Sequence, residues 1–112
     1  MIKIGIIGAM ELEVEELKSH MDTSSIITKA GMAFYEGTLN GVNVVIVQSG
    51  IGKVNAALCV QILADVFHIS HVINTGVAGS LNADLDIGDI VISADALHHD
   101  MDVTIFGYQP GE

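Results

Sequence analysis

The sequence predicts an α/β fold, because short apolar runs alternate along the chain with segments of helical spacing. The first apolar run, residues 2–8, leads into residues 10–20, where charged and apolar side chains follow the helical period. A second helical pattern covers residues 53–67 and precedes another apolar run at 71–74. Apolar runs next to helices are typical of buried strands in a sheet that helices cover.

A β-hairpin is predicted between the two helices. Asn40-Gly41 separates two β-rich runs, residues 33–39 and 42–48. Asn-Gly is a strong hairpin signal because both central positions of the turn favour positive φ. Before this hairpin, residues 22–25 are predicted to form a polar turn and residues 26–29 a short strand.

The segments outside these elements are mostly predicted as turns and loops. Residues 49–52 are small and indicate a turn, and residues 81–86 indicate a connecting loop. Residues 89–93 are predicted as a further strand, and residues 106–112 as an aromatic, glycine-containing loop. The 112 residues, half of them hydrophobic, are enough for one compact domain.

The charge of the chain narrows the possible partners. Fourteen acidic residues stand against four lysines and no arginine, which gives a formal net charge of −10. Such a balance argues against nucleic acid and against an acidic membrane surface as partners. The lack of arginine also argues against tight binding of phosphate or carboxylate groups. An uncharged or cationic small molecule is therefore the favoured ligand.

Several features indicate a protein of the cytoplasm. Neither a signal peptide nor an apolar run long enough to span a membrane is visible. Cys59 is the only cysteine, so no intrachain disulfide is possible. A single unpaired cysteine fits a reducing compartment.

The turn after the first strand is the first candidate site. Gly8 and Ala9 would let a ligand approach the backbone, and open α/β sheets bind ligands at the carboxyl ends of their strands. The turn lacks the Lys-Ser/Thr ending of a phosphate loop and the third glycine of a dinucleotide fingerprint. Glu11 and Glu13 follow it, and a carboxylate at a strand end suits general acid or base catalysis. The alternative is that these glutamates form the solvated face of an amphipathic helix.

A second glycine-rich strand end covers residues 75–79. It is either a plain turn or a backbone surface that lies against a ligand, and the sequence leaves both interpretations open.

A cluster of His and Asp residues near the end of the chain suggests metal binding at first sight: His98, His99, Asp100 and Asp102. Adjacent residues of a strand point to opposite faces, however, so they would not converge on one ion. A polar surface or packing around a site is the favoured interpretation, and no metal site is predicted.

Five segments in register carry a family resemblance. They are GIIGAMELEVE (5–15), QSGIGKVNAA (48–57), INTGVAGSL (73–81), IGDIVIS (87–93) and HDMDVTIFGY (99–108). Together they closely resemble the bacterial 5′-methylthioadenosine/S-adenosylhomocysteine nucleosidases, within the wider family of purine nucleoside phosphorylases. The resemblance implies a twisted, partly barrel-like mixed sheet flanked by helices. It also implies a homodimer that uses neither a metal nor an organic cofactor.

The resemblance also implies an activity and the residues that carry it. The reaction is hydrolysis of the N-glycosidic bond of an adenine nucleoside, which releases adenine. Glu13 matches the residue that acts as general base on the catalytic water. The positions matching the walls of the nucleoside site, the last three of them in an apolar patch for the 5′-substituent, are Met10, Ile51, Val77, Ala78, Gly79, Val103, Phe106 and Tyr108.

Val77 and the length of the chain depart from the family pattern. Valine at 77 replaces a serine that these nucleosidases often have, so a hydroxyl that could hold water or the sugar is missing. Family members are also roughly twice as long for one domain. Residues 1–112 are therefore predicted to be the N-terminal part of a single nucleosidase domain, inactive alone and completed by a C-terminal fragment.

Two other functions remain open at this stage. One is a non-catalytic nucleoside-binding or dimerisation module. The other is a sister purine nucleosidase, such as a futalosine hydrolase. An apolar pocket for the 5′-substituent argues mildly against the second alternative, since Met10 and Ile51 suit a thioether better than a polar group.

Overall fold

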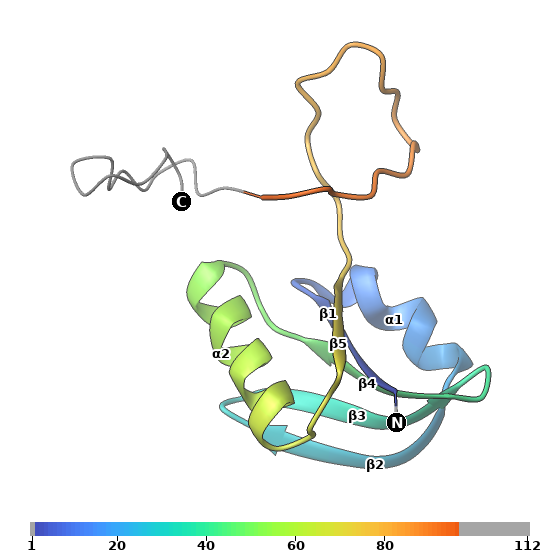
Figure 1. The fold of residues 1–112 in the computed structure, drawn as a ribbon, viewed down its shortest axis with the longest axis vertical. Coiled ribbons are helices and arrows are strands. Elements are labelled where there is room, and N and C mark those ends of the chain that lie inside the picture. The colour runs from blue at the N-terminus through green and yellow to red at the C-terminus, as the bar shows by residue number, and fades with distance from the viewer. Residues whose placement is uncertain (1, 97–112) are drawn as a thin grey trace. The chain divides into compact units, whose positions relative to one another are not determined.

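The computed structural model describes residues 2–96 of the chain, and its regular elements form a mixed sheet with two helices (Figure 1). In chain order these elements are β1 (Lys3–Gly8), α1 (Glu11–His20), β2 (Asp22–Lys29), β3 (Met32–Leu39), β4 (Val42–Gln48), α2 (Lys53–Asp65) and β5 (His71–Asn74). The chain divides into two compact units, Met1–Ala78 and Gly79–Glu112. All seven elements belong to the first unit.

The sheet has the strand order β2-β3-β4-β1-β5. β2, β3 and β4 form an antiparallel meander, whereas β1 lies parallel to both β4 and β5. The described strands form an open sheet, with β2 and β5 at its two edges. The mixed α/β fold predicted from the sequence is confirmed, and β1 brings its carboxyl end next to those of β4 and β5.

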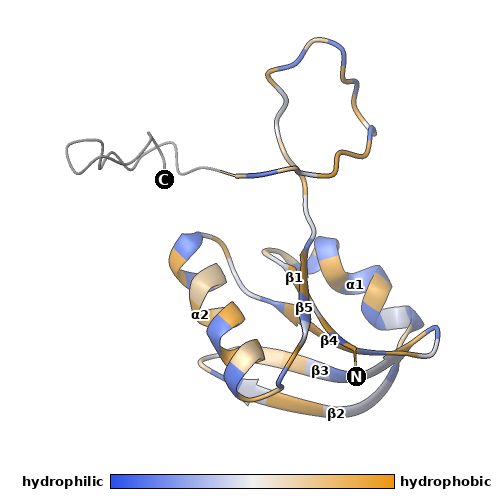
Figure 2. Cartoon of the chain, in the orientation of Figure 1, coloured by the Kyte–Doolittle hydropathy of each residue, from blue (hydrophilic) through white to orange (hydrophobic). Residues whose placement is uncertain are grey.

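The two faces of the sheet carry separate hydrophobic clusters. Alternate residues of a strand point to opposite faces, so Ile7 and Ile6 of β1 enter different clusters. The cluster with Ile7 is closed by Cys59 and Leu63 of α2, and the cluster with Ile6 is closed by Val14 of α1. The helices therefore cover opposite faces (Figures 1 and 2), and the hydropathy colouring marks β1 and β4 as the apolar centre.

α1 forms where its charges suit the helix dipole. Glu11 and Glu13 lie in the first turn, while Lys18 and His20 lie in the last. The helix begins at Glu11 rather than at Met10, because Met10 has extended backbone angles and serves as the N-cap. α2 ends at Asp65, two residues before the predicted end, although Phe67 is still buried in the core.

The predicted hairpin between β3 and β4 is confirmed. Asn40 and Gly41 have φ values of 50° and 80°, the positive values that this two-residue turn requires. A second turn of the same kind joins β2 to β3 through Ala30 and Gly31, with φ values of 52° and 77°.

Two secondary-structure predictions were wrong. Residues 22–25 are not a turn, because β2 begins at Asp22 and pairs with β3 through a register shift between Thr23 and Ser25. Residues 89–93 are not a strand in the structure. A strand is stabilised by hydrogen bonds to a neighbouring strand. No strand among the described residues pairs with residues 89–93, and the side chains of Ile90 and Ile92 are exposed.

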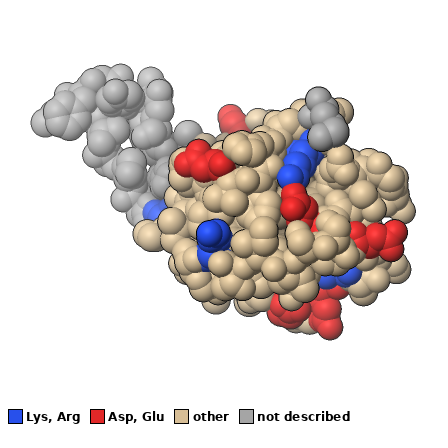
Figure 3. Space-filling view, turned by 90° about the horizontal axis from the view of Figure 1, so that it is seen from below, with Lys and Arg blue, Asp and Glu red and all other residues tan. Residues whose placement is uncertain are grey.

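Charged side chains are scattered over the face that Figure 3 shows, among a larger area of uncharged residues. Neither helix within residues 2–96 is long and apolar enough to cross a membrane.

Candidate functional site

The carboxylate of Glu13 lies at the carboxyl end of β1. Its Oε2 accepts hydrogen bonds from the backbone N–H of Ala9 at 2.6 Å and of Met10 at 3.0 Å. The side chain is thus folded back from the first turn of α1 onto the turn that follows Gly8. These bonds fix the carboxylate beside the strand end instead of leaving it on the solvated face of the helix.

Two glycines leave room for this carboxylate. A Cβ built at Gly8 would lie 2.8 Å from Cβ of Glu13, and one built at Gly76 would lie 2.9 Å from its Oε1. Both distances are shorter than real Cβ contacts allow. Glu13 therefore occupies a space bounded by the ends of β1 and β5.

Backbone hydrogen bonds hold the ends of three parallel strands together. The N–H of Ser49, just after β4, donates to the carbonyl oxygen of Gly8 at 2.9 Å. The N–H of Thr75, just after β5, donates to the carbonyl oxygen of Ile7 at 2.9 Å. The Glu13 carboxylate thus lies where open α/β sheets bind ligands, as the sequence predicts.

The other predicted site residues of the first unit lie on loops and a helix cap. Met10, Ile51 and Val77 are 41%, 74% and 84% exposed, and Ala78 is exposed as well. Gly79 begins the second unit, where a Cβ would meet nothing within 4 Å. The predictions for Val103, Phe106 and Tyr108 lie outside the described residues.

A metal site is not formed by the residues that the structure describes. Within 2–96, no three His, Cys, Asp or Glu side chains lie close enough together to hold an ion. The cluster from His98 to Asp102 lies outside this range.

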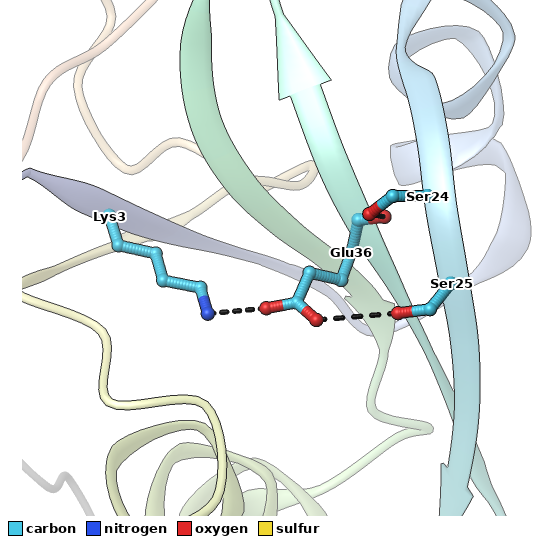
Figure 4. Close-up of polar contacts among 4 residues, drawn as sticks. All are labelled: Lys3, Ser24, Ser25 and Glu36. Carbon is cyan, nitrogen blue, oxygen red and sulfur yellow. Dashed lines mark hydrogen bonds and ion pairs between the residues drawn. The ribbon is translucent and has the colours of Figure 1, made fainter.

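A polar cleft of about 480 Å³ lies at the opposite end of β1. Lys3 of β1 and Glu36 of β3 form an ion pair across β4 in its wall, and Ser25 of β2 donates to Glu36 at 3.3 Å (Figure 4). All three side chains are engaged with one another, and the cleft lies at the amino end of the parallel strands. This arrangement links side chains of three strands, β1, β2 and β3, and is not the favoured catalytic site.

Gly76 is the residue of the Glu13 site that the sequence did not single out. Residues 75–79 were recognised as a glycine-rich strand end, but nothing in the sequence indicated that β5 lies beside β1. The contact between Gly76 and Glu13 depends on that pairing, in which Ile7 faces Asn74.

Comparison with known proteins places this arrangement in a family. Residues 3–111 match the family model described as the phosphorylase superfamily. The 5′-methylthioadenosine/S-adenosylhomocysteine nucleosidase of Chromohalobacter salexigens is 52% identical over 112 residues, which are 100% of this chain and 48% of that relative. The chain spans about half the length of the curated relatives it matches.

Solved structures agree with the sequence match. The Colwellia psychrerythraea 5′-methylthioadenosine/S-adenosylhomocysteine nucleosidase, in complex with adenine, has a TM-score of 0.94 and 51% identity, covering 99% of this chain and 46% of that chain. The futalosine hydrolase of Helicobacter pylori has a TM-score of 0.87 and 33% identity, covering 99% and 48%. Since the family model matches almost the whole chain, this chain belongs to the phosphorylase superfamily.

Proposed function

We propose that this chain is the N-terminal part of a nucleosidase that hydrolyses the N-glycosidic bond of 5′-methylthioadenosine and S-adenosylhomocysteine and releases adenine. The observation that carries the proposal is the Glu13 carboxylate, held by the N–H groups of Ala9 and Met10 at the ends of the parallel strands. The similarity to nucleosidases at 51–52% identity supports the choice of reaction.

The Glu13 carboxylate suits the chemistry of glycosidic cleavage. The sugar becomes oxocarbenium-like in the transition state, so positive charge develops at its anomeric carbon. A fixed carboxylate stabilises that charge and accepts a proton from the attacking water. The water oxygen then bonds to the anomeric carbon while the bond to adenine breaks, and adenine leaves with a proton from a separate acid.

Water is a better nucleophile for this site than phosphate. The turn that carries Glu13 also carries Glu11, and the whole chain has no arginine. Two carboxylates at this turn would repel a phosphate dianion, and its usual bidentate cationic donors are absent from the chain. This charge distribution favours hydrolysis over phosphorolysis.

The nature of the 5′-substituent follows from the residues proposed around it. Met10 and Ile51 carry apolar side chains just after β1 and β4, at the same ends of the parallel strands as Glu13. With Val103, Phe106 and Tyr108, they would suit a thioether better than the larger polar group of futalosine. Val77, Ala78 and Gly79 would supply the wall next to the ribose.

A C-terminal half is needed for this activity, and we propose that residues 1–112 form one domain with it. β5 pairs only with β1 among the described strands, and Val72 and Ile73 on it are about half exposed. An open parallel edge with exposed apolar side chains is well suited to a further strand. The chain alone would lack the acid that protonates adenine and should be inactive.

The test is to reconstitute the enzyme. We would co-express this chain with the C-terminal half of the Colwellia psychrerythraea nucleosidase and purify the complex, called below the reconstituted protein. Release of the purine base is measured with 5′-methylthioadenosine, S-adenosylhomocysteine and futalosine as substrates, as adenine from the first two and as hypoxanthine from the third. We expect turnover of the first two, about 10³-fold or more slower in Glu13→Gln, because the amide cannot accept the proton from water.

The outcomes separate the candidate functions. A folded complex that binds nucleosides but releases no adenine would exclude our proposal and favour the alternative of a non-catalytic nucleoside-binding module. Preference for futalosine would reassign the substrate. Full activity of Glu13→Gln would remove Glu13 from the mechanism.

The assembled enzyme is proposed to be a homodimer in the cytoplasm. Val54 and Leu58 are 82% and 44% exposed and lie four residues apart on one face of α2, and Ile51, which is 74% exposed, lies in the turn just before the helix. Such an apolar stripe supports contact with a second copy. The single cysteine, Cys59, is buried and unpaired, which fits a reducing compartment.

A further inference from the structure

We propose that Gly76 is a positioning residue for Glu13: its lack of a side chain admits the carboxylate between the ends of β1 and β5. The inference rests on the proposed function in one respect, that Glu13 is the general base. Gly76 itself is assigned no contact with the nucleoside. It would act on the reaction only through the place it leaves for Glu13.

The two oxygens of the Glu13 carboxylate have different surroundings. Oε2 is tied to the N–H groups of Ala9 and Met10, at 2.6 and 3.0 Å. Oε1 points to the end of β5, where a Cβ at Gly76 would lie 2.9 Å away. One oxygen is thus fixed to the turn, and the other is limited by the backbone of the neighbouring strand end.

The atoms nearest to an added methyl group at Gly76 all belong to Glu13. The three nearest atoms to a Cβ there are Oε1, Cδ and Oε2 of Glu13, at 2.9, 3.2 and 3.5 Å. No backbone atom is among them. The strands need not move to admit the methyl group, because the end of a flexible side chain gives way first.

Backbone conformation does not explain a glycine at this position. Five glycines in the described chain have positive φ, and Gly76 is not among them. An alanine could adopt its backbone angles without strain. What demands glycine is therefore the contact with the carboxylate rather than the turn.

Gly8 makes a different contact. A Cβ at Gly8 would lie 2.7 Å from Cγ1 of Val14 and 2.8 Å from Cβ of Glu13. Val14 is fully buried, and the Glu13 Cβ is fixed to the helix backbone, so a methyl group there would push α1 itself. At Gly76, by contrast, the three nearest atoms all belong to the carboxyl group of Glu13.

The expected effect follows from the sensitivity of catalysis to geometry. A shift of about 1 Å in a catalytic group can lower the rate about 100-fold. We expect Gly76→Ala to lower kcat of the reconstituted protein about 10- to 100-fold. KM should change less than about 3-fold, because Glu13 acts on the water and not mainly on substrate affinity.

The deciding experiment measures kcat, KM and amide spectra on the reconstituted protein. The ¹⁵N–¹H resonances of Ala9 and Met10 report the bonds to Glu13, and Glu13→Ala defines their positions without a carboxylate. In Gly76→Ala we expect both resonances to move toward those positions. The matched control is Gly5→Ala, where the atoms nearest to a Cβ are the ends of the Ile69 and Leu63 side chains, away from Glu13; kcat and both amides should stay unchanged.

A double-mutant cycle adds a measurement that a merely structural role would not move. Glu13→Asp shortens the side chain and should slow the wild-type enzyme. In the Gly76→Ala background the carboxylate is already displaced, so Glu13→Asp should lower kcat by a clearly smaller factor than it does in the wild-type background. Additive losses would count against the contact.

Each remaining outcome is decisive. A folded Gly76→Ala protein with wild-type kcat and unshifted Ala9 and Met10 amides overturns the proposal. Failure of Gly76→Ala to fold, with Gly5→Ala folded, also overturns it, because Gly76 would then be structural. Lack of adenine release by the wild-type complex would refute the proposed function, while the amide spectra would still report on Gly76 and Glu13.

Discussion

Glu13 differs from the other glutamates of α1 in what its carboxylate contacts. Glu15 and Glu16 are exposed, whereas both oxygens of Glu13 are constrained, Oε2 by two backbone N–H groups and Oε1 by Gly76. Donors and neighbours that are fixed before the substrate binds need no rearrangement during the reaction. Backbone groups therefore create the environment that distinguishes the Glu13 carboxylate from the other carboxylates of α1.

Cys59 gives a residue-scale prediction about pH. Burial raises the pKa of its thiol from 9.0 to about 11. In the unfolded chain the thiol would ionise near 9.0, so the stabilisation is fully present below pH 9 and is lost as the pH rises from 9 to 11. We expect this thiol to lower the free energy of unfolding by at most about 1.4 kcal/mol per pH unit in that interval.

The measurement is urea unfolding at several pH values, with Cys59→Ala as the reference. The difference between the two proteins should change with pH only above about 9. Other groups titrate equally in both, so they cancel. A difference that is constant up to pH 11 would contradict the prediction.

At the residue scale the sequence predicted Glu13 but not its surroundings. Its place after an apolar strand and a small-residue turn made Glu13, with Glu11, a candidate, and the family resemblance singled out Glu13. The bonds from Ala9 and Met10 are local and follow from the same turn. The contact with Gly76 joins residues 63 positions apart, and no local pattern indicates such a pair.

At the scale of elements, the antiparallel strands are fitted closely at Gly37. A Cβ at this residue would lie 2.0 Å from the carbonyl oxygen of Asp22 and 2.9 Å from Cα of Thr23. Both atoms belong to the backbone of β2, next to its register shift. The start of β2 can therefore lie against β3 only because residue 37 has no side chain.

Gly37→Ala is expected to destabilise the protein by about 1–3 kcal/mol, because the overlap is with backbone atoms that must move together. Thr23→Ala is the control on the facing strand: this exposed residue should change stability by less than about 0.5 kcal/mol. Denaturant unfolding gives both values. Equal stabilities for the two variants would show that β2 is not held against β3 as described.

Local signals decided which elements were predicted. Asn40-Gly41 and the apolar runs of β1, β4 and β5 are strong local signals, and those elements were confirmed. The start of β2 is polar and exposed, so its strand character comes from pairing with β3 and was missed. The strand predicted at residues 89–93 was wrong for the opposite reason: the local apolar pattern is strong, but no neighbouring strand pairs with it among the described residues.

The first unit, taken as a whole, leaves large apolar side chains exposed at two separate places. The clearest cases are Val54 and Leu58 of α2, with Ile51 just before the helix, and the edge strand β5. These surfaces are distinct features of the unit, which is why we assign them two occupants: a second copy and the C-terminal half.

The proposed homodimer predicts a specific response to charge on α2. Val54→Glu in the reconstituted protein should shift it from dimer to monomer, because a carboxylate would be buried without a partner. Val60→Glu is the matched control, since Val60 lies on another face of the same helix, and should leave the dimer intact. Sedimentation equilibrium measures the mass of each. A monomeric wild-type protein would refute the assignment.

The strand order has a consequence for biosynthesis. Of the described strands β1 is synthesised first, yet its two neighbours, β4 and β5, end at residues 48 and 74. The β2–β3–β4 meander needs only short-range turns, whereas β1 needs partners far along the chain. β1 must therefore remain incompletely paired until β4 and β5 have both been synthesised, exposed to chaperones and to neighbouring nascent chains.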